Sequence, residues 1–167
     1  MPLRAIAAGL EDRVEALARL MAEEMGKPLP QGRAEIHKCA AACRYAADHA
    51  ATHLAEETVD LGEQAGRVVY RPLGLVLAVM PWNFPFWQVL RCLGPVVMAG
   101  NGLLVKHAPS VQGCAAALED LVRTAGLPDG LFANLVQNYL NTLDYTGELM
   151  QMKMHWMSAG EWVSEMP

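Results

Sequence analysis

Two short apolar runs, each followed by a turn and then by a helical pattern, constrain the fold of this chain most strongly. Residues 75–80 (LVLAVM) are apolar without interruption, which is typical of a parallel strand covered on both faces. A helical pattern over 86–98, a strand over 103–106, a helix over 111–125 and a strand over 131–136 follow in order. This βαβαβ order predicts an α/β fold containing one half of a doubly wound nucleotide-binding domain.

Stiff or polar turns follow the first two predicted strands. Pro81 and Pro85 flank Trp82, Asn83 and Phe84, and the two proline rings disfavour helix for the residues before them, so Asn83 is held on a rigid turn. The second turn is KHAPS, over 106–110. Open α/β sheets bind ligands at the carboxyl ends of their strands, and we therefore expect both turns to line a ligand site.

The residues before the sheet pattern predict two amino-terminal helices. Apolar residues recur at three- and four-residue steps over 3–25, which indicates one amphipathic helix ended by Gly26. A second, alanine-rich helix is predicted over 31–57, a turn over 62–66 and a short strand over 68–70. His49 and His53 are four positions apart in the second helix, as are Cys39 and Cys43. Because no further ligand is spaced nearby, a solvated histidine pair and small core thiols are favoured over a metal site.

Length, charge and cysteine usage restrict the class of protein. A chain of 167 residues suits one domain with a real core. The net charge of −5, without a basic stretch among aromatics, argues against nucleic-acid binding. The apolar runs are too short to span a bilayer, so no membrane partner is expected. The four cysteines lie in helical patterns without turn signals, which favours reduced thiols in a cytoplasmic protein.

Three blocks, MPWNFPFWQVLR, AGNGLLVKHAPS and AGLPDGLF, closely resemble the aldehyde dehydrogenase superfamily, and most of all its NAD(P)-dependent succinate-semialdehyde dehydrogenases. The resemblance covers about residues 1–137. Family members are several times longer and form homo-oligomers. The resemblance therefore implies a partial fold, whose start is truncated relative to the family. Residues 138–167 resemble no part of the family, and we expect a frameshifted or read-through tail there.

The resemblance implies roles for residues of both turns. Asn83 matches the family's oxyanion donor, whose side-chain N–H faces the charge that develops during aldehyde oxidation. An asparagine that only ties up a turn is the alternative. Lys106 matches the lysine that hydrogen-bonds the adenosine ribose of NAD or NADP. Met80, Pro81 and Trp82 match positions on the nicotinamide side of the cleft, and plain core packing is a compatible role for Trp82.

Two positions bear on substrate and cofactor choice. Arg91 lies eight residues after Asn83 and matches an arginine of succinate-semialdehyde dehydrogenases, which implies a substrate with a distal carboxylate, such as succinic semialdehyde. An exposed helix arginine is the alternative. Many NAD-preferring relatives have glutamate where this chain has Pro109, and proline can neither grip the ribose nor repel a 2′-phosphate. Use of both NAD and NADP is therefore expected.

The family's nucleophilic cysteine block and its glutamate base have no match in this chain. Cys92 and Cys114 lie inside predicted helices, with no base nearby to lower their pKa. Without a nucleophile the reaction has no first step. We therefore expect a fragment of an aldehyde-oxidising enzyme that is inactive alone. The alternative is a non-catalytic module that binds the cofactor or docks on intact subunits.

Overall fold

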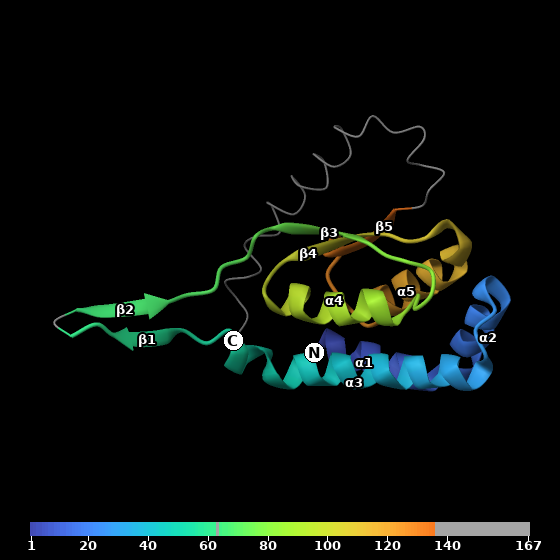
Figure 1. Ribbon diagram of the computed structural model, residues 1–167, viewed down its shortest axis with the longest axis horizontal. Helices are drawn as coiled ribbons and strands as arrows, with labels where there is room; N and C mark the ends of the chain where they lie inside the picture. The colour runs from blue at the N-terminus through green and yellow to red at the C-terminus, as the bar shows by residue number, and fades with distance from the viewer. Residues whose placement is uncertain (63, 136–167) are drawn as a thin grey trace, which may run out of the picture.

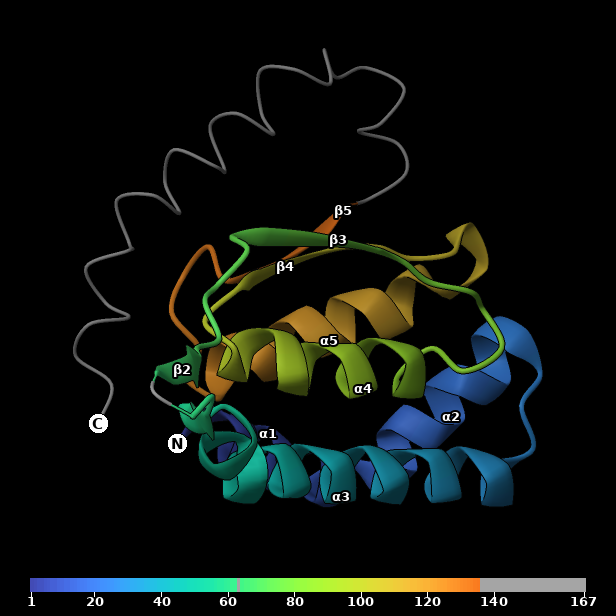
Figure 2. The same cartoon turned by 60° about the vertical axis from the view of Figure 1, so that its left-hand side comes forward.

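A computed structural model describes residues 1–62 and 64–135 of the chain, and the predicted tail over 138–167 lies outside them. Three layers are stacked (Figures 1 and 2): a sheet, then two helices beneath it, then the amino-terminal helices. The elements are, in order, α1 (Pro2–Asp12), α2 (Val14–Met25), α3 (Leu29–His53), β1 (Glu57–Asp60), β2 (Ala65–Val68), β3 (Leu75–Val79), α4 (Trp87–Met98), β4 (Gly102–Lys106), the 3-10 turn η1 (Pro109–Val111), α5 (Gln112–Thr124) and β5 (Phe132–Leu135).

The predicted βαβαβ unit is confirmed. β3, β4 and β5 form a parallel sheet in that order, with Leu75 opposite Gly102 and Leu103 opposite Phe132. α4 and α5 both lie on one face of this sheet (Figure 2). A buried asparagine, Asn101, joins the starts of β3 and β4, because its Oδ1 accepts the backbone N–H groups of Leu73 and Gly74 at 2.6 and 2.9 Å.

The expectation that the first strand is covered on both faces is wrong for the described residues. Leu77 and Val79 of β3 are 58% and 69% exposed, whereas Ala78 between them is buried. Side chains alternate across a strand, so Leu77 and Val79 lie on the face opposite α4 and α5. The uninterrupted apolar run therefore gives β3 two apolar faces, and only one of them is packed against other described residues.

Three amino-terminal helices are present where two were predicted. The apolar stripe over 3–25 continues as expected, but the helix is interrupted at Arg13, whose φ and ψ are −114° and 14°. The Arg13 guanidinium contacts Asp120 of α5 at 3.1 Å. The break lets α1 and α2 pack on α3 and α5 at different angles (Figure 1). The predicted end is confirmed, since Gly26 is left-handed with φ 72°.

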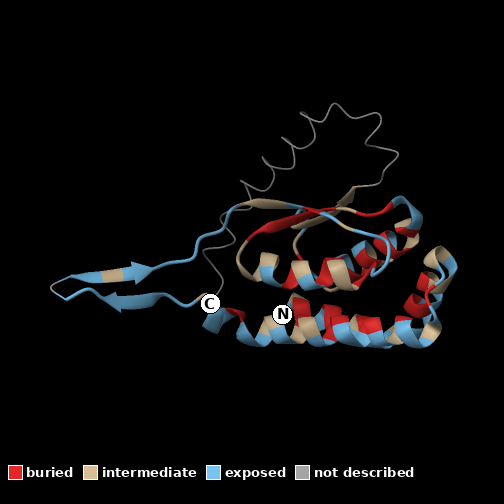
Figure 3. Cartoon of the chain, in the orientation of Figure 1, coloured by how far each residue is buried: buried red, intermediate tan, exposed pale blue. Residues whose placement is uncertain are grey.

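The second predicted helix is shorter than expected, because α3 ends at His53 and the next residues form a hairpin. β1 pairs antiparallel with β2, from Glu57 opposite Val68 to Asp60 opposite Ala65. The turn predicted over 62–66 is thus partly strand, and the strand predicted over 68–70 lies earlier, over Ala65–Val68. The hairpin projects away from the three layers (Figure 1), and its strands are almost entirely exposed (Figure 3).

The core lies between the helical layers and the lower face of the sheet (Figure 3). Its fully buried large side chains come from all three layers and include Leu3, Ile6, Met21, Ile36, Phe86 and Leu103. Gly94 permits a close approach of α3 and α4, because a Cβ at this position would lie 3.0 Å from the Ala46 Cβ. The amino-terminal helices therefore form the floor on which the helices of the βαβαβ unit rest.

Candidate functional site

The predicted site residues of the two turns meet at the carboxyl edge of the sheet. Val79 pairs with Lys106 in the parallel register, and the Met80 N–H donates to the Lys106 carbonyl at 3.0 Å. Met80 and Lys106 are thus adjacent and both partly exposed. Pro81, Trp82 and Asn83 follow on an irregular turn, as the sequence predicts, and all three are exposed.

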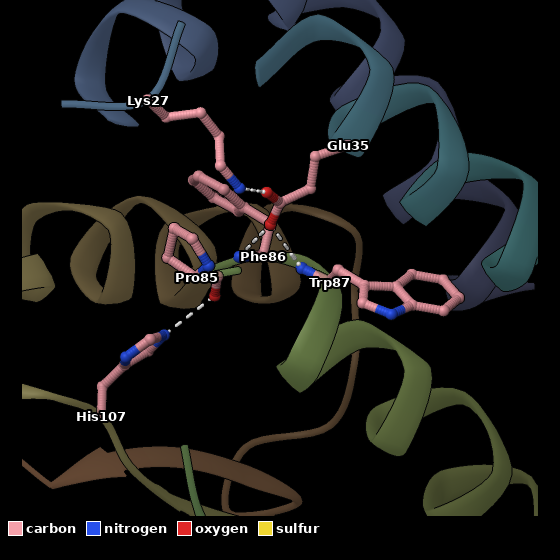
Figure 4. A network of polar contacts seen from close by, with 6 residues as sticks. All are labelled: Lys27, Glu35, Pro85, Phe86, Trp87 and His107. Carbon is pink, nitrogen blue, oxygen red and sulfur yellow. Dashed lines mark hydrogen bonds and ion pairs between the residues drawn. The ribbon is translucent and has the colours of Figure 1, made fainter. Parts of the chain in front are cut away.

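The end of this turn is fixed by a side chain from another layer. Glu35 of α3 directs Oε1 at the first turn of α4, where it accepts the N–H groups of Phe86 and Trp87 at 3.0 and 2.9 Å (Figure 4). The Glu35 side chain is only 1% exposed. Since the first N–H groups of a helix have no partner within it, a carboxylate there acts as an N-terminal cap and complements the helix dipole.

Lys27 neutralises Glu35. Its ammonium forms an ion pair with Glu35 Oε2, and both side chains are buried. The same ammonium lies 4.0 Å from the centre of the Phe84 ring, a distance suited to a cation–π contact. Lys27 lies just after α2, so the turn that carries Asn83 is tied to two segments of the amino-terminal layer.

His107 holds the turn from the opposite side. The buried imidazole accepts the Ala108 N–H on Nδ1 at 3.0 Å, which leaves Nε2 protonated to donate to the Pro85 carbonyl at 2.8 Å (Figure 4). Burial lowers the pKa of His107, although the hydrogen bond to Pro85 opposes this shift. The neutral ring therefore links the turn after β4 to the turn after β3.

A second glutamate caps α5 in the same manner. Glu24 of α2 accepts the N–H groups of Gly113 and Cys114 at 2.6 and 2.8 Å. The amino ends of both crossover helices are thus occupied by carboxylates of the chain itself. A phosphate group that bound at either helix end would have to displace Glu24 or Glu35. Lys106, partly exposed at the same edge, is free of this competition.

Arg91 lies on α4, in a groove between α3 and α4. The groove has a volume of about 500 Å³ and a mostly apolar wall; its lining residues are Lys38, Ala41, Ala42, Tyr45, Ala46, Trp87, Leu90, Arg91 and Pro95. Arg91 is exposed, and within residues 1–62 and 64–135 no carboxylate forms an ion pair with it. Lys38 supplies a second cation, with its ammonium 3.8 Å from the centre of the Trp87 ring.

None of the four cysteines is prepared to act as a nucleophile. Cys39, Cys43 and Cys114 are buried free thiols and Cys92 is partly buried. Burial raises the pKa of all four, that of Cys43 to about 12. A thiolate is the reactive form, so the described residues contain no activated thiol.

The histidine pair of α3 serves a local role. The His49 ring stacks on Tyr45 at 4.2 Å, and His53 Nε2 lies 3.2 Å from the Tyr45 hydroxyl. No group of three potential metal ligands is found in the part of the chain that the structure describes. In the same residues, no helix is both long and apolar enough to cross a membrane.

Sequence reasoning missed Glu24, Lys27, Glu35 and His107. Glu35 precedes Ile36 on the buried side of α3, and His107 directly follows a buried strand. Charged or titratable residues in such positions require partners, and this is the signal that could have been used. The partners themselves could not be inferred, because Glu35 and Phe86 are 51 positions apart.

A sequence profile described as "Aldehyde dehydrogenase family" matches residues 2–151. The chain belongs to this family. The match extends beyond Gln137, into the segment that is expected from the sequence to be an unrelated tail. Among solved structures, the succinic semialdehyde dehydrogenase from Streptococcus pyogenes in complex with NADP+ superposes with a TM-score of 0.80 at 30% identity, over 84% of this chain and 31% of that one.

Curated relatives point to the same branch of the family. A probable succinate-semialdehyde dehydrogenase [NADP(+)] of Synechocystis sp. is 50% identical over 134 residues, which are 80% of this chain and 30% of that protein. The succinate semialdehyde dehydrogenase [NAD(P)+] Sad of Escherichia coli is 45% identical over 130 residues, 78% of this chain and 28% of its own length. The chain therefore spans less than a third of the length of these curated relatives, and its fold is the amino-terminal part of the aldehyde dehydrogenase fold.

Proposed function

We propose that this chain forms the amino-terminal part of the catalytic unit of an NAD(P)-dependent succinate-semialdehyde dehydrogenase, which oxidises succinic semialdehyde to succinate. The turn that begins at Met80, beside Lys106, and exposes Asn83 carries this proposal. Its support is the similarity to relatives of that name at 45–50% identity. The free cysteines favour a cytoplasmic location, which is part of the proposal.

Each residue then has one task in the proposed reaction. The Asn83 side-chain N–H donates to the aldehyde oxygen as that oxygen becomes negative during attack on the carbonyl carbon. A neutral amide stabilises this charge without adding a charge of its own to the site. Arg91 binds the distal carboxylate of the substrate through its guanidinium.

The residues at the sheet edge fit a nicotinamide dinucleotide. With Glu24 and Glu35 already on the ends of α5 and α4, Lys106 is the available partner for the adenosine ribose. Met80 and Trp82 border the nicotinamide side. Pro109 places no carboxylate against a 2′-phosphate, so either NAD or NADP is accommodated. The bound cofactor supplies the acceptor for the hydride that the aldehyde loses.

The nucleophile and the general base are proposed to come from segments other than residues 1–135, so that the chain by itself has no turnover. The raised pKa of its four thiols supports this view. A second candidate, a subunit-docking or cofactor-binding module without catalysis, is favoured by one observation: the exposed apolar side chains of Leu77 and Val79 on β3.

A chimera tests the proposal. Residues 2–135 would replace the matching segment of the Escherichia coli relative, and oxidation of succinic semialdehyde would be followed with NAD and NADP. We expect activity in the chimera, none in the 167-residue chain alone, and a loss of about 10²–10³ in kcat for Asn83→Ala. A folded chimera that binds cofactor but gives no oxidation, or an Asn83→Ala variant with full activity, would overturn the catalytic role and favour the docking module.

A further inference from the structure

Three side chains from other elements contact the four residues that follow Asn83. The Lys27 ammonium lies 4.0 Å from the centre of the Phe84 ring. His107 donates to the Pro85 carbonyl at 2.8 Å, and Glu35 accepts the next two N–H groups at 3.0 and 2.9 Å (Figure 4). We propose that Lys27, Glu35 and His107, which we call the clamp, are positioning residues that hold Asn83 as the oxyanion donor. This inference rests on the proposed function of Asn83.

The turn needs such support because it has little of its own. Residues 81–84 are exposed and lie in neither helix nor strand. No side-chain hydrogen bond of Asn83 itself is found within the described residues. An oxyanion donor works only when its N–H is placed in advance, since a misplacement of about 1 Å costs about a hundredfold in rate. Met80 anchors the start of the turn through its bond to the Lys106 carbonyl, and the residues that follow Asn83 must fix its other end.

Glu35 is the central member of the clamp. Its two carboxylate oxygens have separate partners, with Oε1 on the two N–H groups of α4 and Oε2 on Lys27. A buried carboxylate is tolerated only when such partners replace its hydration. In Glu35→Gln, the amide NH2 would face either the Lys27 ammonium or the backbone N–H donors, and one of these contacts is lost. This variant therefore loosens the clamp with almost no change in volume.

Glu24 offers a matched control. It also extends from the amino-terminal layer and accepts two N–H groups at the start of a crossover helix, those of Gly113 and Cys114 in α5. None of its hydrogen bonds involves residues 80–87. Glu24→Gln thus weakens a helix end of the same kind without removing a hydrogen bond to the turn that carries Asn83.

The first experiment uses the 167-residue chain, with amide hydrogen exchange and ¹⁵N relaxation measured by NMR. In Glu35→Gln we expect the amides of Phe86 and Trp87 to exchange about tenfold faster or more, and the backbone and side-chain amides of Asn83 to gain fast motion. In Glu24→Gln only the amides at the start of α5 should change. An Asn83 that stays ordered in Glu35→Gln, or that loosens equally in both variants, would overturn the inference.

His107→Asn is a second test in case Glu35→Gln does not fold, because it removes the hydrogen bond on the opposite side of the same turn. The shorter side chain cannot reach the Pro85 carbonyl, and we expect it to loosen Asn83 as well. Unchanged order of Asn83 in a folded His107→Asn chain would remove His107 from the clamp and overturn the inference as stated.

The second experiment measures kinetics in the chimera. We expect Glu35→Gln to lower kcat about tenfold to a hundredfold with KM for succinic semialdehyde nearly unchanged, and Glu24→Gln to leave kcat within about twofold. In an Asn83→Ala background, Glu35→Gln should lower kcat no further, because its effect passes through Asn83. The same factor in both backgrounds would overturn the inference. If Asn83→Ala alone costs nothing, the proposed function fails, and the NMR experiment still decides whether the clamp orders the turn.

Discussion

His107 and Pro85 are separated by 22 positions and joined by a hydrogen bond of 2.8 Å from the imidazole Nε2 to the proline carbonyl. The other ring nitrogen accepts the Ala108 N–H, so both nitrogens are satisfied only when the ring is neutral. Burial is the main cause of the lowered pKa of His107, and nearby Lys106 adds to it, whereas the Pro85 bond and Glu24 favour the charged ring. Protonation would set a ring N–H against a backbone N–H.

The first prediction concerns pH. Folding lowers the pKa of His107 from its ordinary value of about 6.5. The unfolded chain therefore binds a proton on His107 at a higher pH than the folded chain does. The stabilisation by neutral His107 is therefore fully present above pH 6.5 and is lost as the pH falls below it. We expect urea melts to show lower stability at pH 5.5 than at pH 7.5.

His107→Gln is the control for this prediction, because glutamine does not titrate. This variant should be less stable at pH 7.5 but should lose less on acidification than the parent chain. An equal loss between pH 7.5 and pH 5.5 in both proteins would show that other groups cause the pH dependence.

The second prediction concerns the buried ion pair. Lys27→Met leaves Glu35 buried without its cation, and breaking a buried pair in this way costs about 3–5 kcal/mol. The expected result is a much lower urea midpoint, or a chain that no longer folds. Arg33→Met is the control, because Arg33 forms a solvent-accessible ion pair with Glu15, and the urea midpoint of this variant should barely move. Similar losses in both variants would contradict the importance of burial.

The part of the fold that follows from local periodicity was predictable. The strands and helices from Leu75 to Leu135 were placed within about two residues, because apolar runs, proline turns and helical spacing each act over a few positions. The turn around Asn83 was predicted for the same reason. The family resemblance, now confirmed, further implied Arg91 and Lys106, whose roles stay predictions.

What could not be predicted depends on distant contacts. The break at Arg13 carries no glycine or proline, and its Asp120 contact is 107 positions away. α3 ends earlier than predicted because the residues after it pair in a hairpin. Thr58 and Val59 gave only a short β-branched signal, from which this pairing could not be predicted. Glu35 could have been recognised as a charge in a buried stripe, but its role in capping α4 required the packing of two layers.

The third prediction concerns Asn101. Its Oδ1 accepts two N–H groups before β3, and its Nδ2 donates to the Val96 and Ala99 carbonyls at 3.3 Å. Asn101→Ala removes all four bonds, and we expect a loss of about 1–3 kcal/mol in the free energy of unfolding. Gln112→Ala, which removes one hydrogen bond to the Ala108 carbonyl, should cost less. A larger effect at Gln112 would contradict the central role of Asn101.

The fourth prediction tests the groove between α3 and α4. In the chimera, Arg91→Leu should raise KM for succinic semialdehyde about tenfold or more, because a charged hydrogen bond to the substrate carboxylate is lost. KM for butanal, which has no carboxylate, should change less than about twofold. Lys38→Met should have a smaller effect in the same direction, because its ammonium lies over the Trp87 ring. Equal effects on both aldehydes would refute carboxylate binding in this groove.

The last prediction concerns the thiols and follows from their burial. Thiol reagents attack the thiolate, and a raised pKa leaves almost none of it at pH 7.5. Cys39, Cys43 and Cys114 are buried, and only Cys92 is partly exposed. We expect a disulfide reagent such as DTNB to modify Cys92 first and slowly in the native chain, and all four thiols at once in urea. Cys92→Ser should abolish the first phase. A native thiol that reacts faster than free cysteine would reveal an activated nucleophile and would contradict the proposal that this chain depends on other segments for its chemistry.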